Sequence, residues 1–426
     1  MKKIIPVMLV LMLCMSLCAC DVPGKVDLPP VPTLEPEESP AADPAQEEVP
    51  TVPEEPENVR VTVTVGRSEL EALDPENGTQ RILYFAYETP SVNVDGNPEA
   101  SDAINEYIAM LDETYYTGED YGDGPGTGFN NMLTLAEDNY LYVRQSGMEG
   151  ARIDLSADRS VKVMRADSGL ICLLYNDYID LGGAHGEYKY TGYCFDTSNG
   201  ELLTLDKLSP DSEGLKSFLT DYMVTLASED EYIRTAMEGF VEPEAVEDSL
   251  AALVREGSWY FDSEGMTVFS DLYEIGSYAS GIVEFKIPYA ELAGKVDAKY
   301  IPAASTADGC FRVVRADDMI DGSMEIIDMV KASDEGEHIY FAVDGSVEDV
   351  RISRVDYTGI FYETAQLWYC SEMSDCAVQL VTVIPEGMPD IMISYRTAEG
   401  TRKLYLTESG EDGSLILAGD SIEAVG

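Results

Sequence analysis

Hydrophobic and polar residues alternate with the period of a β-strand where the folded part of the chain begins. Val59 opens the stretch VRVTVTV, and RILYFAYETPSVNV follows from Arg81; both stretches predict strands. Asn97 and Pro98 then predict a helix start, because asparagine caps helices and proline suits the first turn. Apolar residues recur behind them at helical spacing, at Ile104, Ile108, Leu111 and Tyr115. The segment therefore predicts two strands followed by a helix with one apolar face.

Two further segments, GLICLLYNDYID and GEYKYTGYCFD, predict an antiparallel hairpin around a glycine-rich turn. One register opposes three informative pairs, which are Asp177 with Lys189, Tyr178 with Tyr188, and Cys172 with Cys194. Opposite-charge and aromatic pairs both favour this register. It also brings the two thiols close enough for a disulfide, so a Cys172–Cys194 bridge is predicted, with two small buried free thiols as the alternative.

Helical spacing returns in two segments after Asn199-Gly200. Their apolar residues are Leu215, Phe218, Leu219, Tyr222 and Leu226 in the first, and Val246, Leu250, Leu253 and Val254 in the second. A strand pair is expected between residues 258 and 289. Because strands and helices alternate irregularly, with hairpins rather than repeated crossovers, the predicted class is α+β, with antiparallel sheets and packed helices.

Short alternating strands such as FRVVRA, HIYFAV, VRISRV and DIMISY dominate the chain from about Thr306 onward. Gly, Asp and Ser turns separate them, which predicts an all-β, sandwich-like C-terminal domain. Cys370 and Cys376 flank the loop SEMSD and are expected to be able to close that hairpin with a disulfide; a reduced pair is the alternative. Five cysteines follow Cys20, an odd number, so at least one of them has no partner within the chain.

The first residues have the pattern of an export signal. Lys2 and Lys3 precede an apolar run that is too short for a comfortable permanent membrane helix and ends in the sequence LCAC at Cys20. This ending resembles a bacterial lipobox, which predicts a lipid on Cys20; an ordinary secretory signal is the alternative. Residues 21–58 contain ten of the 21 prolines and no aromatic residue, so they predict a disordered acidic tether.

Charge narrows the range of partners. The formal net charge is −53, which repels nucleic acid and anionic lipid headgroups and attracts cationic partners. General solubility of an exported protein is the alternative reading of this acidity. The glycine-rich acidic stretch at 118–128 lacks the ligand spacing of a calcium-binding EF-hand loop, so a plain loop is expected there.

Candidate catalytic chemistry is scarce. The chain has two histidines, His185 and His338, and neither has a neighbouring zinc-ligand motif. No nucleophile elbow, P-loop or dinucleotide-binding fingerprint is recognisable. We therefore expect no enzyme activity, cofactor or metal site. His185, in GGAHG, is expected to stabilise a turn, with partner contact as the alternative.

Three stretches together resemble a known family. YETPSVNVDG, GGAHGEYKYTGYCFDTSNGELLTLDKL and WYFDSEGMTVFSDLYEIGSYASGIVEFKIPYAEL are similar to the paired extracytoplasmic domains of unknown function in the anti-sigma factor RsiV and the peptidoglycan deacetylase PdaC. The resemblance covers roughly residues 59–295. It implies two α+β subdomains, 59–180 and 181–300, the second with its hairpin beginning near 168.

The RsiV resemblance also implies a module that binds lysozyme, a typically basic protein. The corresponding contact segment runs from Asp271 to Ser280, and Tyr273 and Tyr278 match the family's tyrosines. Family members commonly carry a proline before each tyrosine, where this chain has Leu272 and Ser277. Core packing of the two rings is the alternative to a role in binding.

These observations predict a five-part chain: a lipoprotein signal (1–19), a tether (20–58), two RsiV-like subdomains (59–180 and 181–300) and a β-rich domain (306–426). The expected function is that of a non-enzymatic lipoprotein on the outer face of the bacterial cytoplasmic membrane, binding a lysozyme-like protein or a wall glycan. The candidate partner-binding residues are Asp271, Tyr273, Glu274, Tyr278 and His185. A structural envelope component that docks through its C-terminal domain is the alternative, and a carboxylate-based wall hydrolase is a lesser one.

Overall fold

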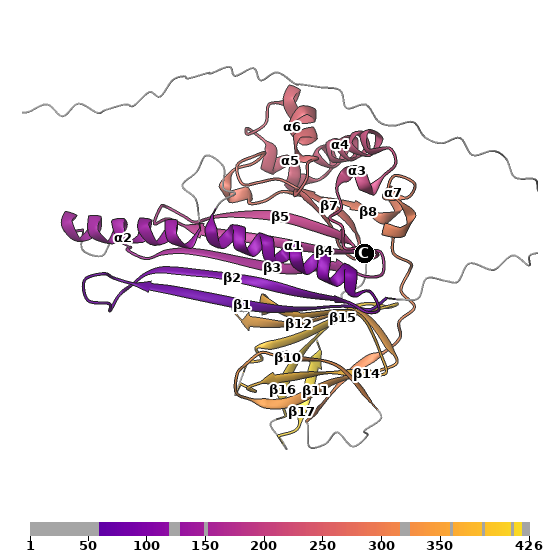
Figure 1. Cartoon of the computed structure of the whole chain (residues 1–426). Coiled ribbons are helices and arrows are strands. Elements are labelled where there is room, and N and C mark those ends of the chain that lie inside the picture. The colour runs from indigo at the N-terminus through magenta and orange to yellow at the C-terminus, as the bar shows by residue number, and fades with distance from the viewer. Residues whose placement is uncertain are drawn as a thin grey trace, which may run out of the picture. The chain divides into compact units, whose positions relative to one another are not determined.

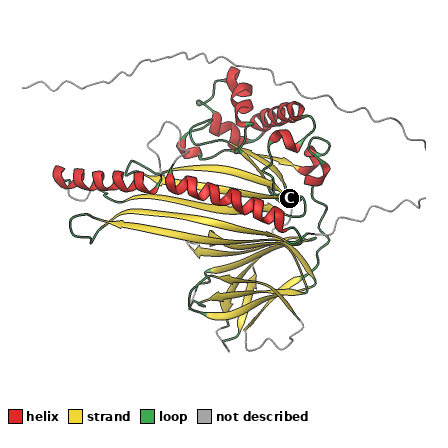
Figure 2. Ribbon diagram, in the orientation of Figure 1, coloured by secondary structure: helices red, strands yellow, loops and turns green. Residues whose placement is uncertain are grey.

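A mixed ten-stranded sheet organises the part of the chain that the structure, a computed structural model, describes: residues 59–118, 128–148, 152–315, 324–357, 361–385, 388–409 and 413–419 (Figures 1 and 2). The sheet runs in the order β17-β16-β15-β12-β13-β1-β2-β3-β4-β5. Its strands are β1 Val61–Leu73, β2 Arg81–Val94, β3 Leu155–Ala166, β4 Leu170–Asp180, β5 Glu187–Asp196, β12 Ser346–Tyr357, β13 Phe361–Ser374, β15 Ile391–Thr397, β16 Gly400–Glu408 and β17 Leu415–Gly419. Only β2 and β3 pair in parallel within it.

Strand β1 connects the strands from the N-terminal part of the chain to those from the C-terminal part. It pairs with β2 along its whole length and, on its other edge, with β13, where Val63 lies opposite Tyr369. Pro56–Gly426 forms one compact unit. The predicted all-β domain therefore contributes β12, β13 and β15–β17 to the same sheet as the N-terminal strands, a long-range pairing that the sequence does not reveal.

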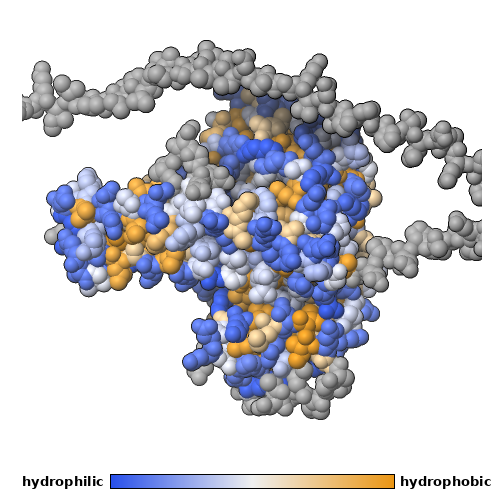
Figure 3. Space-filling view, in the orientation of Figure 1, coloured by the Kyte–Doolittle hydropathy of each residue, from blue (hydrophilic) through white to orange (hydrophobic). Residues whose placement is uncertain are grey.

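Helices α1 (Pro98–Thr117) and α2 (Phe129–Ser146) lie across one face of the sheet (Figure 2). Asn97 caps α1 as predicted, since its side chain accepts a hydrogen bond from the Ala100 N–H. The apolar face of α1 includes Ile104 and Ile108, both buried. Apolar side chains gather near the outer end of α2 (Figure 3), where Leu141 and Met148 are exposed.

A second layer of helices packs on β4 and β5 around a small antiparallel sheet. Its helices are α3 Leu205–Leu208, α4 Ser212–Glu229, α5 Glu231–Met237, α6 Val246–Leu253 and α7 Tyr289–Leu292, and its strands are β6 Trp259–Phe261, β7 Gly265–Phe269 and β8 Glu284–Pro288. Short 3-10 turns occur at Pro243–Ala245, Tyr278–Ser280 and Ala298–Tyr300. The core between the layers includes Leu170, Leu219 and Phe285. The close approach of β5 to β6 depends on Gly192 of β5, because a Cβ there would overlap the carbonyl oxygen of Trp259 on β6.

The C-terminal region adds a four-stranded sheet, β10-β14-β11-β9, which packs on the end of the large sheet. Its strands are β9 Cys310–Arg315, β10 Glu325–Lys331, β11 Glu337–Asp344 and β14 Cys376–Thr382. Trp368 and Ile393 of the large sheet meet Phe341 and Leu380 of the small one in a shared apolar core. The α+β class and the β-rich C-terminal region are thus confirmed.

The predicted bridge between Cys370 and Cys376 is wrong. Both thiols are free and buried. The two strands do not form a hairpin, because the chain leaves β13 in the large sheet, turns at Asp375 with φ of 45°, and enters β14 in the other sheet. Cys370 consequently lies opposite Thr62 and Val350, while Cys376 lies opposite Glu325.

The expected lipidation site Cys20, the signal segment and the tether lie outside the described residues, as does most of the glycine-rich acidic stretch. Across the residues that are described, no helix has the length and apolarity needed to cross a membrane.

Candidate functional site

Two segments that are far apart in the sequence meet at one end of the β4–β5 hairpin. The imidazole of His185, in the hairpin turn, stacks on the ring of Tyr278, with 3.8 Å between ring centroids and 22° between ring planes. The hydroxyl of Tyr273 lies 3.2 Å from His185 Nε2. Tyr188, at the start of β5, lies edge-on to Tyr278 at 6.5 Å. We call His185, Tyr188, Tyr273 and Tyr278 the aromatic cluster.

Both ring nitrogens of His185 are engaged. Nδ1 lies 3.0 Å from the carbonyl oxygen of Gly186, and because a carbonyl can only accept, Nδ1 carries a proton. In the neutral ring, Nε2 therefore accepts a hydrogen bond from the Tyr273 hydroxyl. The arrangement joins the hairpin turn to the 271–281 loop, and it leaves neither nitrogen free for a substrate proton or a metal.

The carbonyl oxygen of Gly186 accepts two hydrogen bonds within the aromatic cluster, the first of them from His185. The second comes from the Tyr278 hydroxyl at 3.0 Å. A Cβ at this position would overlap the ring of Tyr178, so a larger residue would have to displace that ring.

The loop before Tyr278 is held by ion pairs. Arg255, just after α6, donates two hydrogen bonds to the carboxylate of Glu274 at 2.6 and 3.0 Å and one to Asp271 at 3.1 Å. The Glu274 carboxylate also accepts the Asp271 N–H at 2.8 Å. Hydrogen bonds to Glu274 raise the pKa of Arg255 above its ordinary value. The three side chains close a tight turn around the two residues between Asp271 and Glu274, which are Leu272 and Tyr273.

Tyr273 has a backbone conformation that is rare for its type. Its φ is 63°, in the left-handed region that costs an L-residue roughly 1–2 kcal/mol. Its side chain is 47 % exposed, so burial of the ring does not account for the strain. Backbone strain of this kind is concentrated at functional sites.

Exposed aromatic surface extends from the cluster onto α5. Tyr232 is 57 % exposed and donates a hydrogen bond to the carbonyl oxygen of Ser280 at 2.7 Å. Glu187 is exposed beside the hairpin turn. The site therefore combines partly exposed rings of low conformational freedom with acidic neighbours, a composition suited to binding a protein or a glycan.

Comparison with known families places most of this site within one domain. The family model described as "Protein of unknown function (DUF3298)" matches residues 220–290. The chain contains a DUF3298 domain. Tyr232, Arg255, Tyr273 and Tyr278 lie inside the DUF3298 domain, whereas His185 and Tyr188 reach it from the hairpin that precedes it.

Two crystal structures of DUF3298 family proteins are similar to the chain. One, from Bacteroides fragilis, has 20 % sequence identity and a TM-score of 0.41, and the match covers 56 % of this chain and 94 % of that one. The other, from Pseudomonas aeruginosa, has 22 % identity and a TM-score of 0.36, with 57 % and 97 % covered. At these values neither similarity indicates an activity or a ligand. No curated protein matches the chain significantly.

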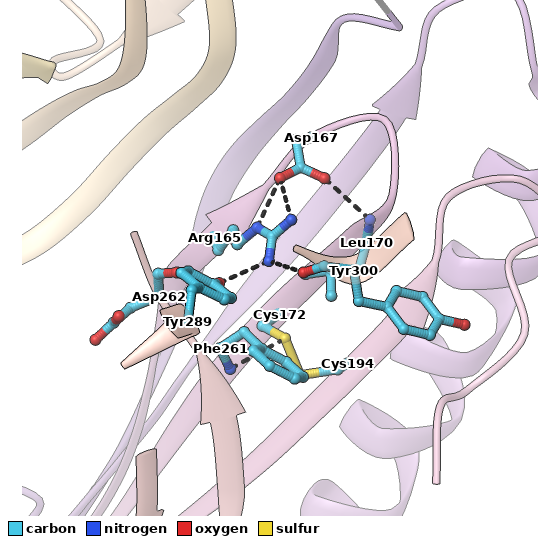
Figure 4. The surroundings of a disulfide bond; sticks show 9 residues. All are labelled: Arg165, Asp167, Leu170, Cys172, Cys194, Phe261, Asp262, Tyr289 and Tyr300. Atoms are coloured by element: carbon cyan, nitrogen blue, oxygen red, sulfur yellow. Dashed lines mark hydrogen bonds and ion pairs between the residues drawn. A yellow bond between two sulfur atoms is a disulfide. The ribbon is translucent and has the colours of Figure 1, made fainter. Parts of the chain in front are cut away.

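A disulfide closes the base of the hairpin, and a polar contact links it to the DUF3298 domain (Figure 4). Cys172 and Cys194 form a disulfide, and β4 and β5 pair in the predicted register. The Phe261 N–H points at Cys172 Sγ from 3.5 Å. These contacts hold the strands that flank the His185 turn in place relative to β6, the edge strand of the domain's small sheet that faces them.

A buried arginine adds a second link at the same place. Arg165, 5 % exposed, is ion-paired with Asp167 and donates hydrogen bonds of 2.6 Å to the Tyr289 hydroxyl and to the Tyr300 carbonyl oxygen (Figure 4). Burial raises the pKa of Tyr289, so its hydroxyl stays protonated and donates onward to the Asp262 carbonyl oxygen. The DUF3298 domain is thereby bonded to β3 as well as to β4.

All five residues proposed from the sequence as partner contacts, His185, Asp271, Tyr273, Glu274 and Tyr278, meet at this site. Asp271 and Glu274 hold the loop through Arg255 instead of pointing away from it. Sequence reasoning missed Arg255 and Tyr232. No local pattern marks either residue, since their partners lie 16 to 48 positions away. Among the described residues, no group of three or more His, Cys, Asp or Glu side chains is placed to hold a metal ion.

Proposed function

We propose that this chain is a non-enzymatic surface lipoprotein that binds a basic, lysozyme-like protein through the aromatic cluster of its DUF3298 domain. The observation that carries the proposal is the exposed ring of Tyr273, held in a strained conformation against His185. Rigid aromatic side chains are effective binding anchors because little conformational entropy is lost when they are covered. The resemblance of the 271–280 segment to the RsiV contact segment names the partner class.

Electrostatics supports a basic partner. With a net charge of −53, the chain attracts cationic proteins over several ångströms and repels nucleic acid and anionic surfaces. Export and anchoring through Cys20 belong to the same proposal, because they place the DUF3298 domain where wall-degrading enzymes act. Both ring nitrogens of His185 are engaged by neighbouring groups, which favours binding over catalysis.

Calorimetric titration of residues 56–426 with a basic c-type lysozyme tests the proposal. Binding is expected at low salt and should weaken at near-physiological salt, because screening shortens the reach of the charges. Truncation of the anchor, Tyr273→Ala, is expected to weaken binding by at least about tenfold.

A matched control uses another exposed tyrosine. Tyr142, on α2, is 61 % exposed and belongs to no part of the aromatic cluster, so Tyr142→Ala should bind like the parent protein. Absence of heat at both salt concentrations would overturn the lysozyme proposal. Equal losses from Tyr142→Ala and Tyr273→Ala would show that the cluster is not the contact.

A second candidate function is docking of the C-terminal region onto an envelope component. Strand β10 ends the four-stranded sheet, and on it Ile326 and Met329 are 46 % and 47 % exposed. An edge strand with apolar side chains is a template for pairing with another chain. Apolar docking of this kind should be insensitive to salt, which distinguishes it from electrostatically steered binding.

A further inference from the structure

The strained conformation of Tyr273 requires a restraint beyond the one long backbone hydrogen bond of its turn, which runs from the Glu274 N–H to the Asp271 carbonyl oxygen at 3.3 Å. A bulky aromatic residue rarely adopts a positive φ, and the segment 271–281, DLYEIGSYASG, contains no proline that could fix it. The exposed ring has one polar contact, from its hydroxyl to His185. Without a restraint on the backbone, the residue would relax to an extended or right-handed conformation and carry the ring away from His185.

Arg255 supplies this restraint through the residues on either side of Tyr273. Its guanidinium holds the Glu274 carboxylate with two hydrogen bonds and the Asp271 carboxylate with a third. Glu274 also binds the backbone of Asp271, by accepting its N–H at 2.8 Å. The separation between positions 271 and 274 is thereby fixed, and the two residues between them must form a tight turn.

Arg255 is itself anchored. It follows α6, and its Nη1 donates a hydrogen bond to the Ala252 carbonyl oxygen at 2.9 Å, at a helix end where a positive charge is favoured. A planar guanidinium can hold one carboxylate with two bonds while bonding a second, which an ammonium group cannot do with the same geometry. Beyond the turn, Ile275 is fully buried and fixes the continuing chain.

We infer that Arg255 is a positioning residue that holds Tyr273 in its left-handed conformation and so presets the aromatic cluster for binding. The effect on affinity rests on the proposed function, whereas the effect on the position of the ring does not. A loop already in its bound conformation loses less entropy when the partner arrives, so presetting strengthens binding without adding a contact.

The first test needs no ligand. The chain has two histidines, His185 and His338, so the NMR signals of their ring Cε1–H groups can be assigned with one His185→Gln variant. His185 stacks on Tyr278 and is bonded to Tyr273, whereas His338 lies on β11 and is bonded to Gln379. In Arg255→Met, the His185 signal should move toward its position in Tyr273→Ala, and the His338 signal should stay in place.

Two further variants separate positioning from general damage. Arg255→Lys keeps the charge and should move the His185 signal part of the way. Arg144→Met removes an exposed arginine on α2 and should move neither signal. A His185 signal unchanged in a folded Arg255→Met protein would overturn the inference.

The second test is a double-mutant cycle with basic lysozyme. Arg255→Met is expected to weaken binding about tenfold, the factor associated with losing a preset left-handed residue. The double variant Arg255→Met/Tyr273→Ala should bind no more weakly than Tyr273→Ala alone, because Arg255 acts through Tyr273. Additive losses would show that Arg255 contacts the partner directly and would overturn the positioning role. If the parent protein does not bind lysozyme, the proposed function fails, and the NMR comparison still decides the role of Arg255.

Discussion

Replacing Cys172 and Cys194 together with alanine is expected to lower the free energy of unfolding by about 3 kcal/mol. The bridge joins residues 22 positions apart, and its removal lets the unfolded chain explore conformations that the closed loop forbids. Both cysteines are buried where β4 and β5 meet the DUF3298 domain. Urea denaturation followed by circular dichroism measures the change.

A free thiol of the same chain provides the control for this experiment. Cys310 is exposed and unbridged, so Cys310→Ser should change the free energy of unfolding by less than about 0.5 kcal/mol. A double alanine variant as stable as the parent protein would mean that the register of β4 and β5 is secured by packing alone. In that case the hydrogen bonds of Arg165 to Tyr289 and Tyr300 would be the main remaining polar links at the base of the hairpin.

The second large effect concerns Glu88, an acid inside the sheet. Its side chain on β2 is 3 % exposed and accepts the Val161 N–H at 2.8 Å. Arg67 of β1 lies 3.5 Å away, and Asp158 of β3 adds a negative charge nearby. Burial outweighs the attraction of Arg67 and raises the pKa of Glu88 to about 7.

The free energy of unfolding should consequently fall as pH rises from the unfolded pKa of Glu88 to its folded pKa. Between the pKa of an unfolded glutamate, 4.5, and the folded value of about 7, the folded protein retains a proton that the unfolded chain has lost. The contribution of this bound proton to the free energy of unfolding is fully present below pH 4.5. It is lost as pH rises to 7, which lowers the free energy of unfolding by up to about 3 kcal/mol. Glu88→Gln cannot ionise, so it should be more stable than the parent protein at pH 8 and similar to it at pH 4.5.

The measurement is the difference in urea midpoint between Glu88→Gln and the parent protein at pH 4.5 and pH 8. Taking the difference cancels the general repulsion of an acidic chain, which also grows with pH. Glu106→Gln, an exposed acid on α1, should show no such pH-dependent difference. A difference for Glu88→Gln that is the same at both pH values would show that folding does not raise the pKa of Glu88.

Local patterns predicted the local structure of this protein well. Asn97 and Pro98 located the start of α1, and charge and aromatic pairing gave the register of β4 and β5, because the interacting groups are one turn or one hairpin apart. The spacing of Met132, Ala136, Tyr140 and Val143 would also have indicated α2, although polar residues between them weaken that signal. The rings of Tyr273 and Tyr278 were chosen by resemblance, and no periodicity distinguishes them from core tyrosines.

Long-range relations were not predictable from one sequence. Nothing in VTVTV specifies that its second edge pairs with a strand about three hundred residues later, since any alternating strand of the C-terminal region would fit equally well. Cys370 and Cys376 resemble the ends of a hairpin until the change of sheet at Asp375 is seen. The role of Arg255 depends on the separation of two acids across a turn, which is a property of the folded backbone.

The central place of β1 determines how the protein responds to mechanical force. A pull on the chain that precedes Val59 acts along β1, which is hydrogen-bonded to β2 along its length and to β13 on its other edge. Strands loaded along their axis must break many ladder bonds at once, whereas strands peeled from an edge break them singly. Tension that enters at Val59 is therefore shared between two strand pairings, and the DUF3298 domain is attached farther along the sheet, at the β5 edge.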